Sequence, residues 1–238
     1  MKKIISFLIL LSVLCIFAGC GRTVNPLIEK KIVSAVRSHI KAEKWDCKLL
    51  GDPNLVDVKM PDINLSGTNI SYKNANIDKV DLHFKNLTYN IHTKSIKSCE
   101  EATADIKIKD SDLTKIIREY ITIIDSPAVI AKDDNITIKG ETEILSLNVN
   151  LEVTGSLYIK HGTEIILEPK SFKVMKLGVV IPNIAKKIIT DKINPVYSLK
   201  DNPYGIYIND FHYSKGYFYA KGKFDSVKIM EIFKDSSE

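Results

Sequence analysis

The sequence lacks the short motifs by which common catalytic and metal sites are recognised. It has no G-x-S-x-G segment, no glycine-rich loop to cradle a phosphate and no regularly spaced oxygen ligands for calcium. Its histidines show neither H-x-x-x-H nor H-x-H spacing, and they are His39, His83, His92, His161 and His212. We therefore expect no enzyme, no metal site and no cofactor, and we expect the histidines to be solvated.

The chain also has little excess charge. Without Lys2 and Lys3 its 34 basic residues fall to 32, against 29 acidic residues, a net charge of +3. The lysines are spread along the chain and mostly alternate with apolar residues, which is typical of a solvated face. This pattern argues against a nucleic-acid partner.

No transmembrane helix is expected at the N-terminus, because the apolar run there is too short. It extends from Ile4 to Phe17, whereas a spanning helix needs roughly 20 residues. Lys2 and Lys3 precede this run, and small residues follow it. That order is typical of a secretory signal peptide, which we predict over residues 1–19.

Ala18, Gly19 and Cys20 resemble a bacterial lipobox, with Phe17 at the position where leucine is usual. The resemblance implies cleavage before Cys20 and attachment of a diacylglycerol to its thiol. Two acyl chains make a stable anchor. We therefore expect an exported lipoprotein of the cell envelope, membrane-anchored on the extracytoplasmic side and tethered by residues 20–25. Plain secretion with a free Cys20 is the alternative.

The rest of the mature chain has only two cysteines, Cys47 and Cys99. An exported protein meets oxidising conditions in many bacteria, so a disulfide between them is one expectation. Two separate thiols are the other.

Three segments show the apolar spacing of amphipathic helices, at residues 26–42, 112–124 and 182–193. Asn25 is expected to cap the first, with Pro26 at its first helical position. Asp110 or Ser111 is expected to cap the second, which has the clearest pattern. In the third, Ile184, Ile188 and Ile189 fall on one face.

The segments between these helices alternate apolar and polar residues, which predicts strands. The alternation changes phase near Lys85–Asn86, which indicates a bulge. A long alternation at 145–159 is interrupted only by Gly155, where we expect the sheet to bend. Tight turns are predicted at 132–134, 160–162 and 214–216, and repeated hairpins are antiparallel. The predicted class is α+β, with one long curved antiparallel meander wrapped around amphipathic helices.

Four stretches resemble the LmeA-type phospholipid-binding family, once described as a domain of unknown function. They are NISYKNANIDKVDLHFKNLTYNI, ADIKIKDSDLTKIIREY, ITIKGETEILSLNVNLEVTGSLYI and PYGIYINDFHYSKGYFYAKGKF. The resemblance covers about residues 26–225 and is one of pattern. It implies a tubular lipid-binding, BPI-like half-barrel, a phospholipid ligand and no catalytic residues.

We accordingly expect a single lipid-binding domain at 26–230, followed by a polar tail at 231–238. The expected ligand is a phospholipid or another acyl-chain molecule, held in an apolar groove between sheet and helices. Candidate lining residues come from the helix at 112–124 and the strand at 145–159, and they are Ile117, Tyr120, Ile121, Leu147, Val149 and Leu151. The alternative is a structural or protein-interaction lipoprotein that binds no lipid, which an exposed patch of Tyr213, Tyr217 and Tyr219 would favour.

Overall fold

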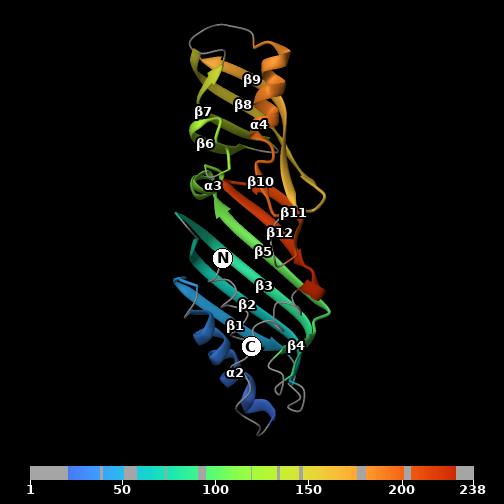
Figure 1. Ribbon diagram of the computed structural model, residues 1–238. Helices are drawn as coiled ribbons and strands as arrows, with labels where there is room; N and C mark the ends of the chain where they lie inside the picture. The colour runs from blue at the N-terminus through green and yellow to red at the C-terminus, as the bar shows by residue number, and fades with distance from the viewer. Residues whose placement is uncertain are drawn as a thin grey trace.

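The molecule is elongated and built mostly of antiparallel β-sheet (Figure 1). Two sheets follow one another along its length, with α3 (Asp110–Ile117) between them. Helices α2 (Gly21–Arg37) and α4 (Asn183–Ile193) lie toward opposite ends. The computed structural model describes residues 21–37, 40–50, 58–72, 74–90, 95–118, 120–132, 135–144, 147–175, 181–200 and 205–228. The expected signal peptide, Cys20 and the polar tail lie outside these ranges.

The first sheet, here the seven-stranded sheet, contains both early strands and the C-terminal hairpin. Its path runs β1-β2-β3-β5-β12-β11, and β4 pairs with β3 off this path. It curls into a half-barrel, as predicted. The strands are β1 (Lys44–Leu50), β2 (Val58–Tyr72), β3 (Ala75–Asn90), β4 (Ser95–Ser98), β5 (Glu101–Lys109), β11 (Ile206–Ser214) and β12 (Tyr217–Phe224).

The second sheet, here the five-stranded sheet, has the order β10-β9-β8-β7-β6. Its strands are β6 (Asp125–Lys132), β7 (Asn135–Ile144), β8 (Leu147–Lys160), β9 (Glu164–Met175) and β10 (Tyr197–Ser198). The three predicted hairpins are confirmed, because β6 pairs with β7, β8 with β9 and β11 with β12, all antiparallel.

The expectation of one continuous meander was wrong in a specific way. After β5 the chain leaves the first sheet through α3 and begins a second sheet at β6. The open edge of β5 is instead covered by β12, which pairs with it over residues 103–109. Local alternation predicts strands and hairpins, but it carries no signal for a pairing between segments more than 100 residues apart.

The predicted phase change in β3 is confirmed, but the expected bulge is not found there, because β2 changes phase at the same place and the register between the two strands is unchanged. Asn86 has a left-handed φ of 47° and lies opposite Pro61, between the pairs Met60↔Leu87 and Asp62↔Lys85. Proline has no N–H for the ladder, so a break there costs little. A second step occurs where Asn69, with φ 49°, lies opposite Asp78. Both strands shift together, so their apolar residues stay on one face through each step.

Gly155 marks an irregularity in the long strand, as expected. The register of β8 against β9 shifts between Thr154 and Gly155. A Cβ atom on Gly155 would lie 2.1 Å from the carbonyl oxygen of Glu168. Only glycine permits this approach of the two backbones.

The helices differ from the prediction at their ends. Within the described residues α2 begins at Gly21, so Pro26 lies inside the helix and not at its first position. Helix α3 ends at Ile117, well before the predicted residue 124, and the Tyr120 and Ile121 N–H groups both donate to the Ile117 carbonyl. Its N-cap is Lys109, without a side-chain cap. Helix α4 ends where predicted and begins one residue late, after the N-cap Pro182, but Ile184 and Ile188 do not share the buried face of Ile189.

Each sheet has its own apolar core, and a smaller cluster joins them. Ile28, Ile32 and Val36 of α2 pack into the core of the seven-stranded sheet, as their spacing predicted. The joining cluster, here the junction cluster, is centred on Ile108, Ile165, Ile208 and Phe218. Two backbone hydrogen bonds support the junction, from Ile208 N–H to Gly162 O at 2.6 Å and from Asp110 N–H to Gly216 O at 3.1 Å.

Candidate functional site

One part of the seven-stranded sheet leaves large apolar side chains only half-buried. On β3 these are Val80, Leu82 and Phe84, which pack against the core without being enclosed by it. They alternate with Lys79, Asp81 and His83, whose side chains face the opposite side of the sheet. We call the apolar row from Ile77 to Phe84 the β3 strip.

Small side chains lie beside the β3 strip on the neighbouring strands. In register, Leu82 lies opposite Ala104 and Phe84 opposite Ala102 on β5. On the next strand Gly222 lies opposite Ala104. Large residues on β3 therefore neighbour small ones on the next two strands, and Ala102 and Ala104 are themselves buried.

The β3 strip is closed at its sides by packed groups. Toward β1, the ring of Trp45 covers Gly67, whose added Cβ would lie 2.5 Å from the ring. The Trp45 indole N–H donates to Ile40 O at 3.3 Å, which holds the ring in place. At the other end, Ile77 contacts both the core of this sheet and the junction cluster. Seven residue steps from Ile77 to Phe84 span about 23 Å, longer than the ~15 Å of one bilayer leaflet's acyl chains.

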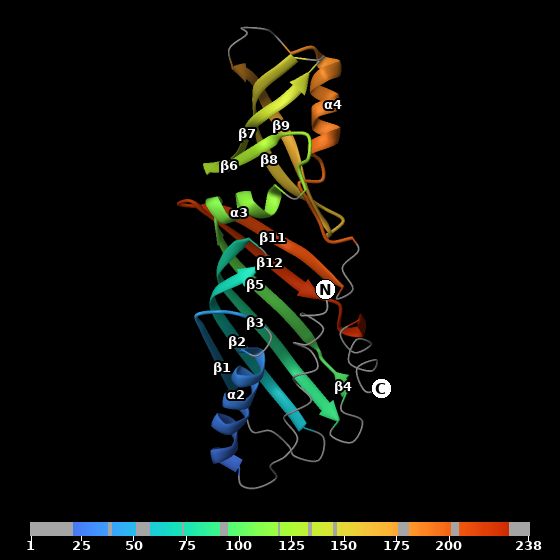
Figure 2. The same cartoon turned by 60° about the vertical axis from the view of Figure 1, so that its left-hand side comes forward.

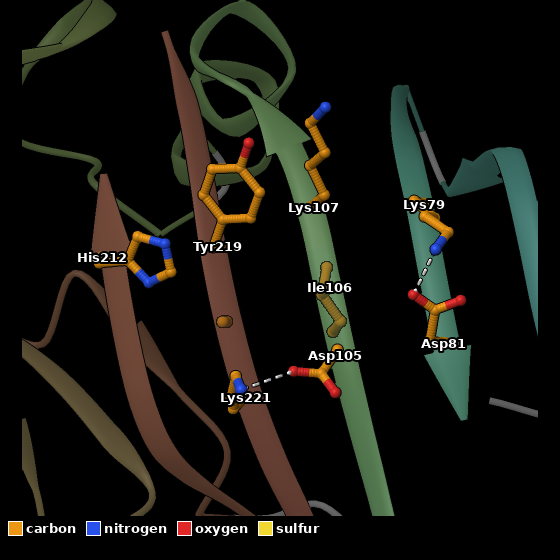
Figure 3. A pocket seen from close by; sticks show the side chains of 9 residues that line it. Lys79, Asp81, Asp105, Ile106, Lys107, His212, Tyr219 and Lys221 are labelled. Carbon is orange, nitrogen blue, oxygen red and sulfur yellow. Dashed lines mark ion pairs between the residues drawn. The ribbon is translucent and has the colours of Figure 1, made fainter. Parts of the chain in front are cut away.

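The opposite face of the same strands carries a shallow polar depression (Figure 3). It has a volume of about 220 Å³, below the roughly 300–1,000 Å³ of typical ligand pockets. Two ion pairs cross it, Lys79–Asp81 at 2.7 Å and Lys221–Asp105 at 3.7 Å. Its small volume and the two ion pairs along it make it unsuited to acyl chains.

Aromatic rings beside this depression are engaged with each other and with a lysine. His212 stacks on Tyr219 with ring centroids 4.8 Å apart. The Lys107 ammonium lies 4.0 Å from the centroid of Tyr217. Tyr213 lies on the other face, where burial and then the carboxylate of Asp110 raise its pKa. The structure therefore does not gather Tyr213, Tyr217 and Tyr219 into one exposed patch.

The structure places most of the predicted lining residues in the core of the five-stranded sheet. Ile117, Ile121 and Leu151 are buried there. Val149 is also buried, and Leu147 begins β8. Tyr120 is 37% exposed and makes an edge contact with Tyr197, with centroids 5.1 Å apart. Sequence reasoning did not single out the β3 strip, although the alternation of Val80, Leu82 and Phe84 was visible.

Those histidines that the structure describes have structural partners or lie at the surface. His83 Nε2 is 2.6 Å from Asp62 Oδ1, and His161 is exposed in the turn before β9. His39 and His92 lie outside the described residues. Across the described ranges no group of three or more His, Cys, Asp or Glu side chains is arranged to hold a metal ion. Within the same ranges no helix has both the length and the hydropathy needed to cross a bilayer.

Cys47 and Cys99 are both free thiols in the structure. Cys47 lies on β1 and Cys99 between β4 and β5, and strands β2 and β3 separate β1 from β4 and β5. Three inter-strand spacings amount to about 14 Å, whereas the Cα atoms of a disulfide lie within about 7 Å of each other. Cys47 and Cys99 are therefore two separate thiols in the structure.

Comparison with known proteins identifies the family. The family model of LmeA-like phospholipid-binding proteins matches residues 22–216, which include α2, the β3 strip and both sheets up to the closing turn. No curated protein and no solved structure matches the chain. Because the match covers most of the sequence, the chain belongs to the LmeA-like phospholipid-binding family.

Proposed function

We propose that this protein holds a phospholipid, or another ligand with acyl chains, against the apolar face of the seven-stranded sheet, and that it carries out no reaction. The observation that carries the proposal is the β3 strip, where Val80, Leu82 and Phe84 remain half-buried next to Ala102 and Ala104. The family supports a phospholipid as ligand.

The energetics favour a chain-like apolar ligand at this position. Each methylene group that leaves water contributes about 0.8 kcal/mol, so a chain laid along the strip gains several kcal/mol. The strip is longer than such a chain, so an acyl chain can lie along it in full. The BPI-like architecture that the family resemblance implied, a curled sheet enclosing lipid within one domain at 26–230, is the arrangement we propose.

The candidates in the five-stranded sheet have a different place in this proposal. Ile117, Ile121 and Leu151 would meet a ligand only if α3 moved away from that sheet, because they now fill its core. Tyr120 is exposed and can contact a ligand in the present conformation. We propose that the lipid occupies the β3 strip first and reaches the α3 residues when the junction opens.

The proposed anchor is a lipid on Cys20, on the extracytoplasmic side of the cell membrane. Helix α2 includes Gly21, which follows Cys20 in the sequence, so an anchor at Cys20 would place the helix close to the membrane. Leu27 of this helix is 55% exposed, which suits a helix that begins at a bilayer surface. Replacing Cys20 by alanine is expected to release the protein from the membrane fraction, and retention of C20A there would overturn the anchor.

The ligand can be tested by native mass spectrometry and lipid extraction of the protein purified from bacterial cells. We expect near-stoichiometric phospholipid on the wild-type chain. The double substitution Leu82→Asn and Phe84→Asn should lower the lipid content at least fivefold, because it puts amides along the strip. Thr103→Asn is the matched control, since Thr103 lies on β5 with its side chain on the opposite face.

Two results would overturn the proposal. One is a wild-type protein that carries no lipid and takes up none from phosphatidylglycerol vesicles, which would favour an interaction lipoprotein instead. The other is equal lipid content in L82N/F84N and T103N when thermal melts show both variants folded.

A further inference from the structure

Helix α4 exposes two isoleucines on its outer face. Ile184 is 77% exposed and Ile188 is 50% exposed. They lie four residues apart, so they are neighbours on one side of the helix. The other side carries Ala185, Ile189 and Ile193, which are buried against the five-stranded sheet. The sequence pattern had put Ile184 and Ile188 on the same face as Ile189, but only Ile189 packs inward.

Lysines flank the two exposed isoleucines. Lys187 and Lys192 are exposed on either side of the pair, and Asp191 is the helix's single acidic residue. Among the described residues none of the three α4 lysines forms an ion pair, since the pairs found lie elsewhere. Lys187, Lys192 and Asp191 leave a local charge of +1 beside the two isoleucines, whereas Lys186 lies toward the buried side of the helix.

This combination matches the surface of an anionic bilayer better than it matches water. Single exposed apolar residues are ordinary on protein surfaces. A pair of isoleucines one turn apart, rimmed by lysines, is the composition of a helix that lies in the membrane interface. Each lysine near an anionic membrane adds about 1 kcal/mol of attraction, roughly a fivefold change in binding.

The position of α4 determines which membrane it can reach. It lies at the end of the molecule away from α2 in both views (Figures 1 and 2). Helix α2 follows Cys20 directly, so an anchor there would hold the opposite end at the bilayer. We infer that α4 docks through Ile184, Ile188 and its flanking lysines on the surface of a second, anionic phospholipid bilayer. That this bilayer differs from the one holding Cys20 depends on the proposed anchor, whereas docking by α4 does not.

Vesicle capture tests this inference with the full chain. The protein is reconstituted into phosphatidylcholine vesicles with one dye and mixed with phosphatidylglycerol-containing vesicles that carry another dye. We expect the wild type to capture the anionic vesicles and to leave neutral ones free. The double substitution Ile184→Ser and Ile188→Ser should lower capture at least tenfold, and Lys187→Glu with Lys192→Glu should do the same at low salt.

Ile130→Ser is the matched control, because Ile130 is 46% exposed on β6 and belongs to the same residue type. Capture by I184S/I188S equal to that by I130S would overturn the inference, as would equal capture of neutral vesicles. If the chain does not stay in the first vesicles, the anchor has failed, and flotation of the soluble protein with anionic vesicles compares the same variants. Lipid extraction of each variant reports separately on the proposed function.

Discussion

Asp110 and Asp112 are two residues apart on α3, yet their carboxylates accept hydrogen bonds from different sheets. Asp112 Oδ1 accepts the Asn76 N–H of the seven-stranded sheet at 3.0 Å. Asp110 Oδ2 accepts the Ala131 N–H of the five-stranded sheet at 3.4 Å. Neither side chain caps its own helix. The first turn of α3 is therefore a polar link between the two halves of the molecule.

The two carboxylates differ in how completely their oxygen atoms are hydrogen-bonded. Asp112 Oδ1 also accepts from Lys115 Nζ at 2.8 Å. Burial acts to raise the pKa of Asp112, but its bonds from Lys115 and Asn76 outweigh burial and hold that pKa below its usual value. Asp110 Oδ1 is buried without a partner in the structure. Burial raises the pKa of Asp110 despite the bond from Ala131.

Replacing Asp112 by alanine is expected to destabilise the protein by about 0.5–1.5 kcal/mol, because the Asn76 N–H loses its acceptor at a partly buried position. Asp112→Asn should cost less, since its amide oxygen can still accept that bond. Because the pKa of Asp112 is lowered by folding, its contribution is present at neutral pH and is lost as the pH falls through its folded pKa. Urea unfolding at pH 7 and in acid measures both effects, and equal stability of D112A and wild type at pH 7 would contradict the linking role.

Asp110→Asn is expected to behave in the opposite way, with stability unchanged or raised by up to about 1 kcal/mol at pH 7, because a buried charge is removed. Folding raises the pKa of Asp110, so the ionised group costs stability at neutral pH and the cost disappears as the pH falls below its unfolded pKa. The difference between D110N and wild type should therefore shrink in acid. A D110N variant that is markedly less stable than wild type at pH 7 would show that the charge itself supports the junction.

The sequence predicted the local features of this fold better than its long-range ones. Hairpins at 160–162 and 214–216 are encoded by residues that tolerate positive φ, such as Gly162 and Gly216, and these turns appear where expected. The pairing of β12 with β5 joins strands more than 100 residues apart, and it depends on how well these two strands fit together in the folded chain. Nothing near either strand signals it.

The candidate site shows the same contrast between local features, which the sequence predicts, and long-range ones, which it does not. Apolar spacing correctly indicated that Ile117 and Ile121 are inward-facing, but it could not distinguish residues that another element covers from residues left half-buried. That difference depends on α3 and α4 covering the five-stranded sheet while the centre of β3 stays less covered. Ile184 shows the converse, because a residue in an apolar stripe became the most exposed large hydrophobic side chain found among the described residues.

Gly155→Ala is expected to cost about 3 kcal/mol or more. The added methyl group would meet the Glu168 carbonyl at 2.1 Å, so β8 and β9 would have to separate and lose neighbouring ladder bonds. Gly216→Asn is the control, because nothing lies within 4 Å of an added Cβ there and asparagine tolerates its positive φ. Chemical denaturation should show a loss below about 1 kcal/mol for G216N, and similar losses for the two variants would contradict the close approach at Gly155.

Cys47 and Cys99 are expected to react slowly with iodoacetamide in the folded protein. Burial, then the charge of Glu29, raises the pKa of Cys47 to about 12, and burial raises the pKa of Cys99 to about 11. At pH 8.5 a thiol with a pKa of 11 is ionised to about one part in 300, whereas an ordinary cysteine is about half ionised. Because the thiolate is the reactive form, alkylation of both residues should be at least a hundredfold slower in the folded chain than in guanidinium.

Peptide mapping by mass spectrometry follows each cysteine separately, with the unfolded protein as control. Fast alkylation of Cys99 in the folded state would show that the edge between β3 and β5 opens readily, and protection that a reductant abolishes would reveal a disulfide.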